Sequence, residues 1–312
     1  MSQPVSFDTL VEAGILRDLL AGGAADLAIV DCRFDLMDPA AGRQSYAAGH
    51  IPGARYADLN QDLSAPVTEE SGRHPLPDPA KFAATLARLG VRGGVQVVAY
   101  DASGGAFAAR LWWMLRAWGH ATVAVLDGGY PAWLAAGGAT RAGEEPTGAV
   151  ARGGHPPAGG AILPPPIASW PVATTAEVAE LLRDPRHLLV DARAPERYSG
   201  LVEPIDAVAG HVPGAENHPF SMNLGADGRF LPAPELRHRW HSRLGSRDPK
   251  QVVAMCGSGV TACHNLLSLA VAGLTGARLY AGSWSEWIRD PTRPIAGAMN
   301  GWGCSPRGGD PP

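Results

Sequence analysis

The sequence lacks the features of a membrane or secreted protein. No run of about 20 apolar residues occurs among its 312 residues, and the first residues carry neither the basic nor the apolar part of a signal peptide. Cysteine is also scarce: Cys32, Cys256, Cys263 and Cys304 are spread along the chain, and no pair has the C-x2-C spacing of metal ligands. These absences predict a cytoplasmic protein without a membrane partner, a disulfide framework or a metal site.

Positive charge is sparse as well. Lysine and arginine total 26 against 30 aspartates and glutamates, the formal net charge is −4, and the arginines are scattered rather than gathered in a basic run. Proteins that bind nucleic acids need a basic face, so we expect no nucleic-acid partner. Apolar residues at 46% and charged residues at 18% are typical of an ordinary globular protein.

What the sequence does contain is an internal repeat. Three segments of the first half recur in the second half in the same order: residues 27–33 as 188–193, residues 49–54 as 210–215, and residues 97–101 as 252–256. A repeat of about 160 residues is far longer than the units of solenoids or propellers. It therefore indicates a duplicated domain.

The repeat predicts the domain organisation. Residues 1–142 form the first domain and residues 172–312 the second, while residues 143–171, dense in glycine and proline, form a linker. Within each half, short β-branched runs alternate with helical patterns, as in βαβ units. We expect two α/β domains, each with a mostly parallel sheet flanked by helices.

Three helices are predicted from local signals. Asp78 followed by proline is an N-cap with proline at the first helical position, and Thr174 with Glu177 forms a capping box. The apolar spacing from Phe107 onward predicts a third helix with Gly119 as its terminator. This third helix directly follows the repeated strand, just as a helical pattern follows Cys256.

The most informative motif is a cysteine at the end of a predicted strand. Cys256 follows the apolar run 252–255 and opens the segment 256–262, with sequence CGSGVTA, directly before a helical pattern. The glycines let the backbone curl so that successive N–H groups point at one atom, and the dipole of the following helix adds to that field. Ligands sit outside the carboxyl ends of parallel strands. We therefore predict a reactive thiolate at this position rather than a buried structural cysteine.

These motifs resemble the two-domain rhodanese family of sulfurtransferases. The resemblance is carried by the Asp-x-Arg strand ends, the Gly-His-[Ile/Val]-Pro-Gly-Ala boxes and the C-terminal cysteine loop, and it covers nearly the whole chain. It implies tandem rhodanese-like domains with Cys256 as the catalytic residue and without a cofactor. It also implies that the first domain is catalytically silent, because Asp101 stands where a cysteine would be needed to carry sulfur.

The resemblance implies a double-displacement reaction. The Cys256 thiolate takes sulfur from a small-molecule donor as a persulfide, and an acceptor thiol such as thioredoxin, or cyanide, then removes it. The cysteine loop is similar to that of 3-mercaptopyruvate sulfurtransferases, which favours 3-mercaptopyruvate as the donor. The loop residues expected to bind substrate and sulfur are Gly257, Ser258, Gly259, Val260 and Thr261.

Arg197 is the residue expected to clamp the donor. A guanidinium matches a carboxylate or sulfonate with two parallel hydrogen bonds. Enzymes of the mercaptopyruvate type have a second arginine nearby, but Ile205 stands at about that place here, and residues 203–211 are more similar to thiosulfate-using relatives. Transfer from thiosulfate to cyanide is therefore an alternative reaction.

The histidines of the repeated boxes have two interpretations. His50 could relay a proton with Ser258, oriented by Asp35 or Asp38. However, His50 and His211 occupy the same box in both halves, which favours a structural role in which each imidazole ties its loop to the backbone. The strand-end pairs expected to hold the scaffold are Asp31 with Arg33 and Asp191 with Arg193.

Two other functions compete with sulfur transfer. Phosphatases of the same fold need a Cys-x5-Arg loop, but Ala262 stands where the arginine would grip phosphate, so this function is disfavoured. A non-enzymatic module that carries a persulfide on Cys256 between partner proteins stays open. Of the other second-half cysteines, Cys263 is expected in the core and Cys304 in an exposed tail.

Overall fold

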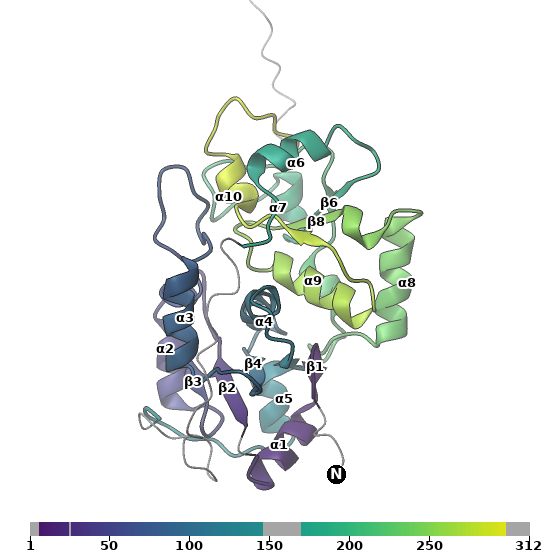
Figure 1. Cartoon of the computed structure of the whole chain (residues 1–312). Coiled ribbons are helices and arrows are strands. Elements are labelled where there is room, and N and C mark those ends of the chain that lie inside the picture. Colours follow the sequence, from purple (N-terminus) through teal and green to yellow (C-terminus); the bar gives the residue numbers. More distant parts are fainter. Residues whose placement is uncertain (1–5, 25, 146–169, 298–312) are drawn as a thin grey trace, which may run out of the picture.

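Two parallel β-sheets, one in each half of the chain, form the framework of the protein (Figure 1). The computed structural model describes residues 6–24, 26–145 and 170–297. Most of the predicted linker, as well as Cys304, lies outside the described residues. We refer to residues 6–145 as the first half and to residues 170–297 as the second half.

The first half has a sheet and flanking helices built from alternating elements. Its strands are β1 (Leu10–Val11), β2 (Leu27–Asp31), β3 (Arg55–Tyr56), β4 (Gln96–Tyr100) and β5 (Val123–Leu126). Its helices are α1 (Ala13–Ala21), α2 (Ala41–Ala48), α3 (Pro79–Arg88), α4 (Ala108–Ala117) and α5 (Gly129–Ala135).

The second half repeats this plan. Its strands are β6 (Leu188–Asp191), β7 (Glu216–Asn217), β8 (Val252–Met255) and β9 (Arg278–Leu279). Its α-helices are α6 (Thr175–Leu181), α7 (Pro195–Ser199), α8 (Ala233–Leu244), α9 (Ala262–Val271) and α10 (Ser283–Trp287). Its short 3-10 helices are η1 (Phe220–Asn223) and η2 (Pro249–Gln251).

The strand order confirms the duplication predicted from the sequence. The first sheet runs β1-β5-β4-β2-β3 and the second runs β7-β6-β8-β9, which is the same order read in the opposite direction and without β1. All neighbouring strands pair in parallel. A single parallel bridge between Val172 and Leu279 takes the place of the β1–β5 pairing in the second half.

Side-chain alternation along the strands explains why helices cover both faces of each sheet. In β2, Ala28 and Val30 join one apolar cluster while Leu27 and Ile29 join another on the opposite face. The first cluster continues without a break into the second half, where α4 packs against α9 (Figure 1). The two halves therefore share one apolar core across their interface.

The local signals read from the sequence are confirmed. The Asp78 side chain accepts hydrogen bonds from Ala80 N and Lys81 N at the start of α3. The capping box of Thr174 and Glu177 is formed at the start of α6. Helix α4 ends just before Gly119, whose φ of 87° lies in the left-handed region that terminates helices.

The strand-end acid–arginine pairs hold the same loop in each half. Arg33 Nη2 lies 2.5 Å from Asp31 Oδ2 and also donates to Gly49 O at 2.7 Å. The symmetric Arg193 lies 2.7 Å from Asp191 Oδ2 and donates to Gly210 O at 2.8 Å. The predicted acid–arginine pairs are therefore confirmed, and each arginine also ties its strand end to the repeated glycine–histidine box.

Within the described ranges, no helix is both long and apolar enough to cross a lipid bilayer.

Candidate active site

Cys256 lies at the carboxyl end of β8, a strand with neighbours on both sides in the second sheet. Residues 257–261, called the cysteine loop below, connect it to α9. The backbone N–H of Cys256 donates to Ser283 Oγ at 3.0 Å. The residue is only 2% exposed, so a donor that reaches its thiol must displace neighbouring groups.

The cysteine loop offers a set of unused hydrogen-bond donors. In the described chain, the backbone N–H groups of residues 257–261 donate to no oxygen or nitrogen atom. Gly259 has a φ of 75°, and a Cβ there would collide with the backbone of Ala281, so this turn requires glycine. Unpaired N–H groups at the start of the ten-residue helix α9 form a cradle for an anion.

The matching loop of the first half shows what such a cradle binds. Asp101, which follows β4 as Cys256 follows β8, accepts four backbone hydrogen bonds through its carboxylate. The donors are the N–H groups of Ser103, Gly105, Phe107 and Ala108, at 2.8 to 2.9 Å. The first half therefore fills its cradle with a built-in anion, whereas the second half places a thiol at the same position.

Helix α10 holds the cysteine loop in place. Trp284 N donates to Cys256 O at 3.0 Å, and Ser285 N donates to Gly257 O at 2.9 Å. Ser283 adopts a φ of 52°, which is uncommon for a residue with a side chain, and its hydroxyl bonds both Cys256 N and Tyr280 O. These contacts fix the direction in which the loop N–H groups point.

Arg197 lies beside the cysteine loop, on the short helix α7. A Cβ at Gly257 would lie 3.5 Å from both terminal nitrogens of its guanidinium. The guanidinium is already engaged: Nη2 lies 2.7 Å from Glu203 Oε1 and 2.9 Å from Asp206 Oδ2. The residue chosen from the sequence as the anion clamp thus faces the loop but is held by two carboxylates of its own chain.

A second arginine at this position comes from the first half, and the sequence analysis missed it. Arg73 lies in the segment between β3 and α3, which rises toward α10 in Figure 1, and its backbone N–H donates to Ser285 Oγ at 3.0 Å. A Cβ at Gly257 would lie 2.7 Å from Arg73 Nη2. The absence of a side chain at Gly257 is what admits this guanidinium to the loop.

A third arginine, Arg110 of α4, is fully buried beneath the loop. Its guanidinium donates to the carbonyl oxygens of Gly259 at 3.0 Å, His74 at 3.0 Å and Leu63 at 3.3 Å, and it has no carboxylate partner in the described chain. Burial lowers its pKa, an effect opposed by the nearby thiols of Cys263 and Cys256. A buried cation without a carboxylate partner favours negative charge on the neighbouring sulfur.

His74, not His50, is the histidine that contacts Ser258. His74 Nδ1 lies 2.7 Å from Ser258 Oγ across the interface between the halves. The relay hypothesis for His50 is wrong, because its ring bonds Tyr46 O at 2.8 Å and approaches Glu145 Oε1 at 3.3 Å. His211 likewise bonds Tyr198 O at 2.7 Å, so both histidines of the repeated boxes are structural.

The chain offered only weak signals for these missed residues. Arg73 and His74 are adjacent basic residues in a loop outside the repeated segments. Arg110 lies one residue before Leu111 and four before Met114 on a helix whose spacing was recognised, so its burial could have been inferred from that pattern. The remaining sequence candidates, Ser258, Val260 and Thr261, all lie in the cysteine loop as expected.

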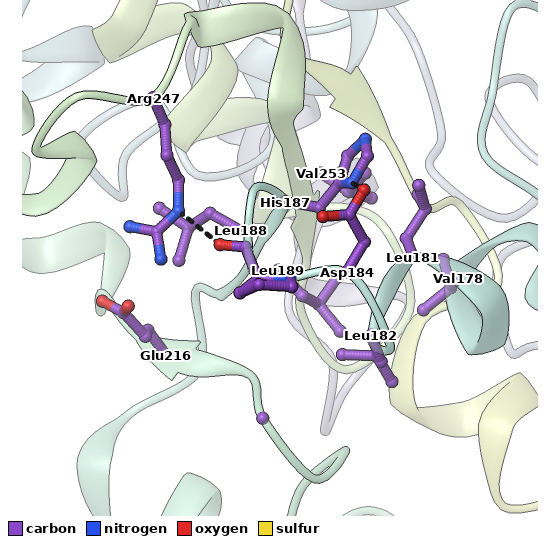
Figure 2. Close-up of a pocket in the computed structure, with 12 residues that line it drawn as sticks. Val178, Leu181, Leu182, Asp184, His187, Leu188, Leu189, Glu216, Arg247 and Val253 are labelled. Atoms are coloured by element: carbon purple, nitrogen blue, oxygen red, sulfur yellow. Dashed lines mark hydrogen bonds and ion pairs between the residues drawn. The ribbon is translucent and has the colours of Figure 1, made fainter.

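A separate cavity of about 150 Å³ lies near the amino end of β6, away from Cys256 (Figure 2). Its floor is apolar, with Val178, Leu182 and Leu189, and its rim carries Glu216 and Arg247. The lining contains no cysteine, serine or threonine. It therefore lacks a thiol or hydroxyl nucleophile, and the cysteine loop is the better candidate for sulfur chemistry.

Comparisons with known proteins identify the family of the chain. A family model described as a rhodanese-like domain matches residues 12–136 and 174–290. The probable 3-mercaptopyruvate sulfurtransferase of Pseudomonas aeruginosa is 50% identical over 277 residues, which cover 87% of this chain and 92% of that protein. The putative thiosulfate sulfurtransferase of Mycobacterium tuberculosis is 41% identical over 288 residues, which cover 92% of this chain and 96% of that protein.

A solved structure is similar along most of the chain. The 3-mercaptopyruvate sulfurtransferase from Leishmania major has a TM-score of 0.73 and 33% identity, and the match covers 93% of this chain and 77% of that one. The two regions matched by the family model contain the two parallel sheets, except for β1, which precedes the first region. The chain is therefore a two-domain member of the rhodanese family of sulfurtransferases.

Proposed function

We propose that the protein transfers a sulfane sulfur from 3-mercaptopyruvate to an acceptor thiol through a persulfide on Cys256. The observation that carries this proposal is the contrast between the two cradles: four N–H groups bind Asp101 in the first half, while those of residues 257–261 are unused around Cys256. Such donors stabilise a sulfur anion as an oxyanion hole stabilises oxygen. The similarity to 3-mercaptopyruvate sulfurtransferases supports the choice of donor.

The first half-reaction forms the persulfide. The Cys256 thiolate attacks the thiol sulfur of 3-mercaptopyruvate, an S–S bond forms, and the C–S bond breaks with its electron pair leaving on the carbon of pyruvate enolate. That carbon must gain a proton to give pyruvate, and the donor's S–H proton is available for it. Ser258 and His74 are positioned to move this proton, because their hydrogen bond joins a hydroxyl of the loop to a neutral imidazole.

The second half-reaction regenerates the cysteine. An acceptor thiolate, such as that of reduced thioredoxin, or cyanide, attacks the outer sulfur, and the Cys256 thiolate leaves. Arg197 and Arg73 hold the donor's anionic group against the loop. In this proposal the first half is catalytically silent because the Asp101 carboxylate cannot carry sulfur. A reducing, cytoplasmic location suits a protein in which Cys32, Cys256 and Cys263 are all free thiols.

Thiosulfate is the second candidate donor. Ile205 stands at about the place where enzymes of the mercaptopyruvate type have a second arginine. The similarity to a putative thiosulfate sulfurtransferase also supports this reaction. The loop and Arg73 suit either anion. The two donors differ in one respect that kinetics can detect: thiosulfate releases sulfite without a proton transfer.

The decisive experiment compares the two activities in one preparation. Sulfide release from 3-mercaptopyruvate with a reductant and thiocyanate formation from thiosulfate and cyanide give two values of kcat/KM, whose ratio identifies the donor. Mass spectrometry after donor exposure should find one added sulfur on the peptide that contains Cys256.

Two variants make this experiment specific. Cys256→Ser should abolish turnover and the adduct, while Cys32→Ala, at a buried thiol of the first half, should keep both. An adduct on Cys256 without turnover of either donor would instead identify a persulfide carrier. Normal turnover by Cys256→Ser would refute the proposal.

A further inference from the structure

We propose that Asp206 is an internal competitor of the donor: its carboxylate occupies the place between Arg73 and Arg197 that the donor's anionic group takes, and donor binding displaces it. The inference rests on the proposed function and adds a residue that sets donor affinity and donor preference. Asp206 lies in the connection between α7 and β7, and neither the cysteine loop nor the proposed reaction at Cys256 requires it.

The geometry is that of a bound carboxylate. Arg73 grips Asp206 with two nearly parallel hydrogen bonds, from Nε to Oδ1 at 3.0 Å and from Nη2 to Oδ2 at 3.3 Å. Arg197 Nη2 reaches the same Oδ2 at 2.9 Å. This two-oxygen arrangement is the one a guanidinium makes with a substrate carboxylate or sulfonate. Both guanidinium groups also lie against Gly257, the neighbour of Cys256, whose sulfur attacks the donor in the proposed reaction.

The charge balance requires the carboxylate to leave. Arg193 is neutralised by Asp191 at 2.7 Å, which leaves two cations, Arg73 and Arg197, facing two anions, Glu203 and Asp206. Arg73 and Arg197, called the arginine clamp here, therefore have no net positive charge left for a third anion while Asp206 stays in place. A donor that replaces Asp206 restores the same balance.

Glu203 and Asp206 are not equivalent in this cluster. Burial raises the pKa of Glu203, but the hydrogen bonds from Arg197 and from the N–H groups of Asp206 and Ile205 outweigh it, so the pKa is lowered. Burial and the neighbouring Glu203 raise the pKa of Asp206 despite the two arginines. Glu203 is thus the more stable partner of Arg197, because burial makes the negative charge of Asp206 less favourable than that of Glu203.

The segment around Asp206 has no regular secondary structure, and Trp284 Nε1 holds it at Val208 O, two residues after Asp206, at 2.9 Å. Residues 201–209 form no helix or strand, and Leu201 and Val202 are 71% and 53% exposed. The Asp206 side chain itself is 3% exposed where it sits between the arginines. Its displacement would therefore uncover the clamp and hydrate the carboxylate, while Glu203 keeps the turn through its bonds to Ile205 N and Asp206 N.

A displaced but nearby carboxylate also discriminates between donors. Coulomb repulsion grows with the charge of the ligand, so a dianion such as thiosulfate is opposed more strongly than a monoanion such as 3-mercaptopyruvate. Asp206 would then bias the protein toward the monoanionic donor.

The test removes the negative charge of Asp206 and keeps the size and shape of its side chain. Asp206→Asn is expected to lower KM for 3-mercaptopyruvate about threefold and to raise kcat/KM for thiosulfate about tenfold, with kcat for 3-mercaptopyruvate unchanged. Asp184→Asn is the matched control, because it changes the net charge equally at an exposed ion pair before β6. Asp184→Asn should leave KM for 3-mercaptopyruvate and kcat/KM for thiosulfate unchanged.

A binding measurement separates this proposal from the proposed function. Calorimetric titration of the Cys256→Ser protein with pyruvate and with sulfate needs no turnover, and adding Asp206→Asn should tighten both, sulfate more than pyruvate. Weaker binding, or a higher KM in the single variant, would show that Asp206 positions the arginines and would overturn the inference. Tighter anion binding by the Asp206→Asn protein together with no turnover of either donor by the unmodified protein would refute only the sulfurtransferase proposal.

Discussion

His74 Nδ1 and Ser258 Oγ lie 2.7 Å apart and form a hydrogen bond between the two halves of the protein. Burial, together with the nearby cations Arg110 and Arg73, lowers the pKa of His74 to about 3. The imidazole is therefore neutral at physiological pH and can accept or pass on a proton. This contact brings a side chain of the first half to the cysteine loop of the second half.

The His74–Ser258 pair predicts an effect that depends on the donor. Ser258→Ala and His74→Gln should each lower kcat with 3-mercaptopyruvate about 100-fold, because the leaving carbon needs a proton in that reaction. Thiosulfate turnover moves no proton and should fall less than about threefold. Stopped-assay kinetics with both donors measure this difference.

The double variant provides the control for this pair. If Ser258 and His74 act as one unit, Ser258→Ala combined with His74→Gln should be no slower than either single variant. Equal losses with both donors would show that the pair only supports the fold of the loop.

Arg110 predicts a change in thiol reactivity. Replacing it by methionine removes the buried cation beneath the cysteine loop, so the Cys256 thiolate should be less favoured and alkylation by iodoacetamide at pH 7 should slow about tenfold. Arg110→Lys keeps the charge and should recover most of the reactivity.

A structural role for Arg110 would give another result. Circular dichroism and the urea midpoint report on folding independently of the thiol. If Arg110→Met and Arg110→Lys lose reactivity equally while both stay folded, the geometry of the guanidinium bonds matters rather than its charge.

Asp101 predicts a loss of stability without loss of chemistry. Its carboxylate accepts four backbone hydrogen bonds in the first half, so Asp101→Ala leaves four N–H groups without this acceptor, three of them in the buried residues Gly105, Phe107 and Ala108. With about 1 kcal/mol or more lost for each, the free energy of unfolding should fall by about 4 kcal/mol. Urea denaturation measures this loss, and kcat per folded molecule should stay near that of the unmodified protein.

How far the sequence could predict the site depends on where each residue comes from. Cys256 and Arg197 belong to segments that repeat or follow a strand, and such local patterns were sufficient to place them at the carboxyl end of the second sheet. His74 and Ser258 are 184 residues apart, and their contact exists only because α4 packs on α9. No local pattern encodes that packing, so Arg73, His74 and Arg110 could not be assigned to the site from the sequence.

The same limit explains the one wrong hypothesis. A relay by His50 is the less favoured of the two interpretations of the sequence, because a residue that recurs in both halves is expected to serve the folding of both. Its stacking on Tyr46, with ring centroids 4.0 Å apart, is repeated by His211 on Tyr198 at 3.8 Å. The residues that distinguish the site, Arg73 and His74, are those for which the halves differ.

Three buried histidines predict a loss of stability in mild acid. Burial lowers the pKa of His74 to about 3 and those of His218 and His264 to about 4. In the unfolded chain each titrates near about 6.5. Between these values the unfolded state binds more protons than the native state, so the free energy of unfolding falls as pH decreases from about 6.5 toward 4.

The steepness of that fall identifies the groups responsible. Each histidine contributes a slope of up to about 1.4 kcal/mol per pH unit, and urea denaturation at pH 7.5, 6.5 and 5.5 measures the sum. His264→Asn should remove one such contribution, because His264 lies fully buried and bonds Gly104 O across the halves. His238→Asn, at an exposed position of α8, should leave the slope unchanged. A stability that stays constant from pH 7.5 to 5.5 would mean that these histidines bind protons as readily in the folded protein as in the unfolded chain, and it would contradict the lowered pKa values.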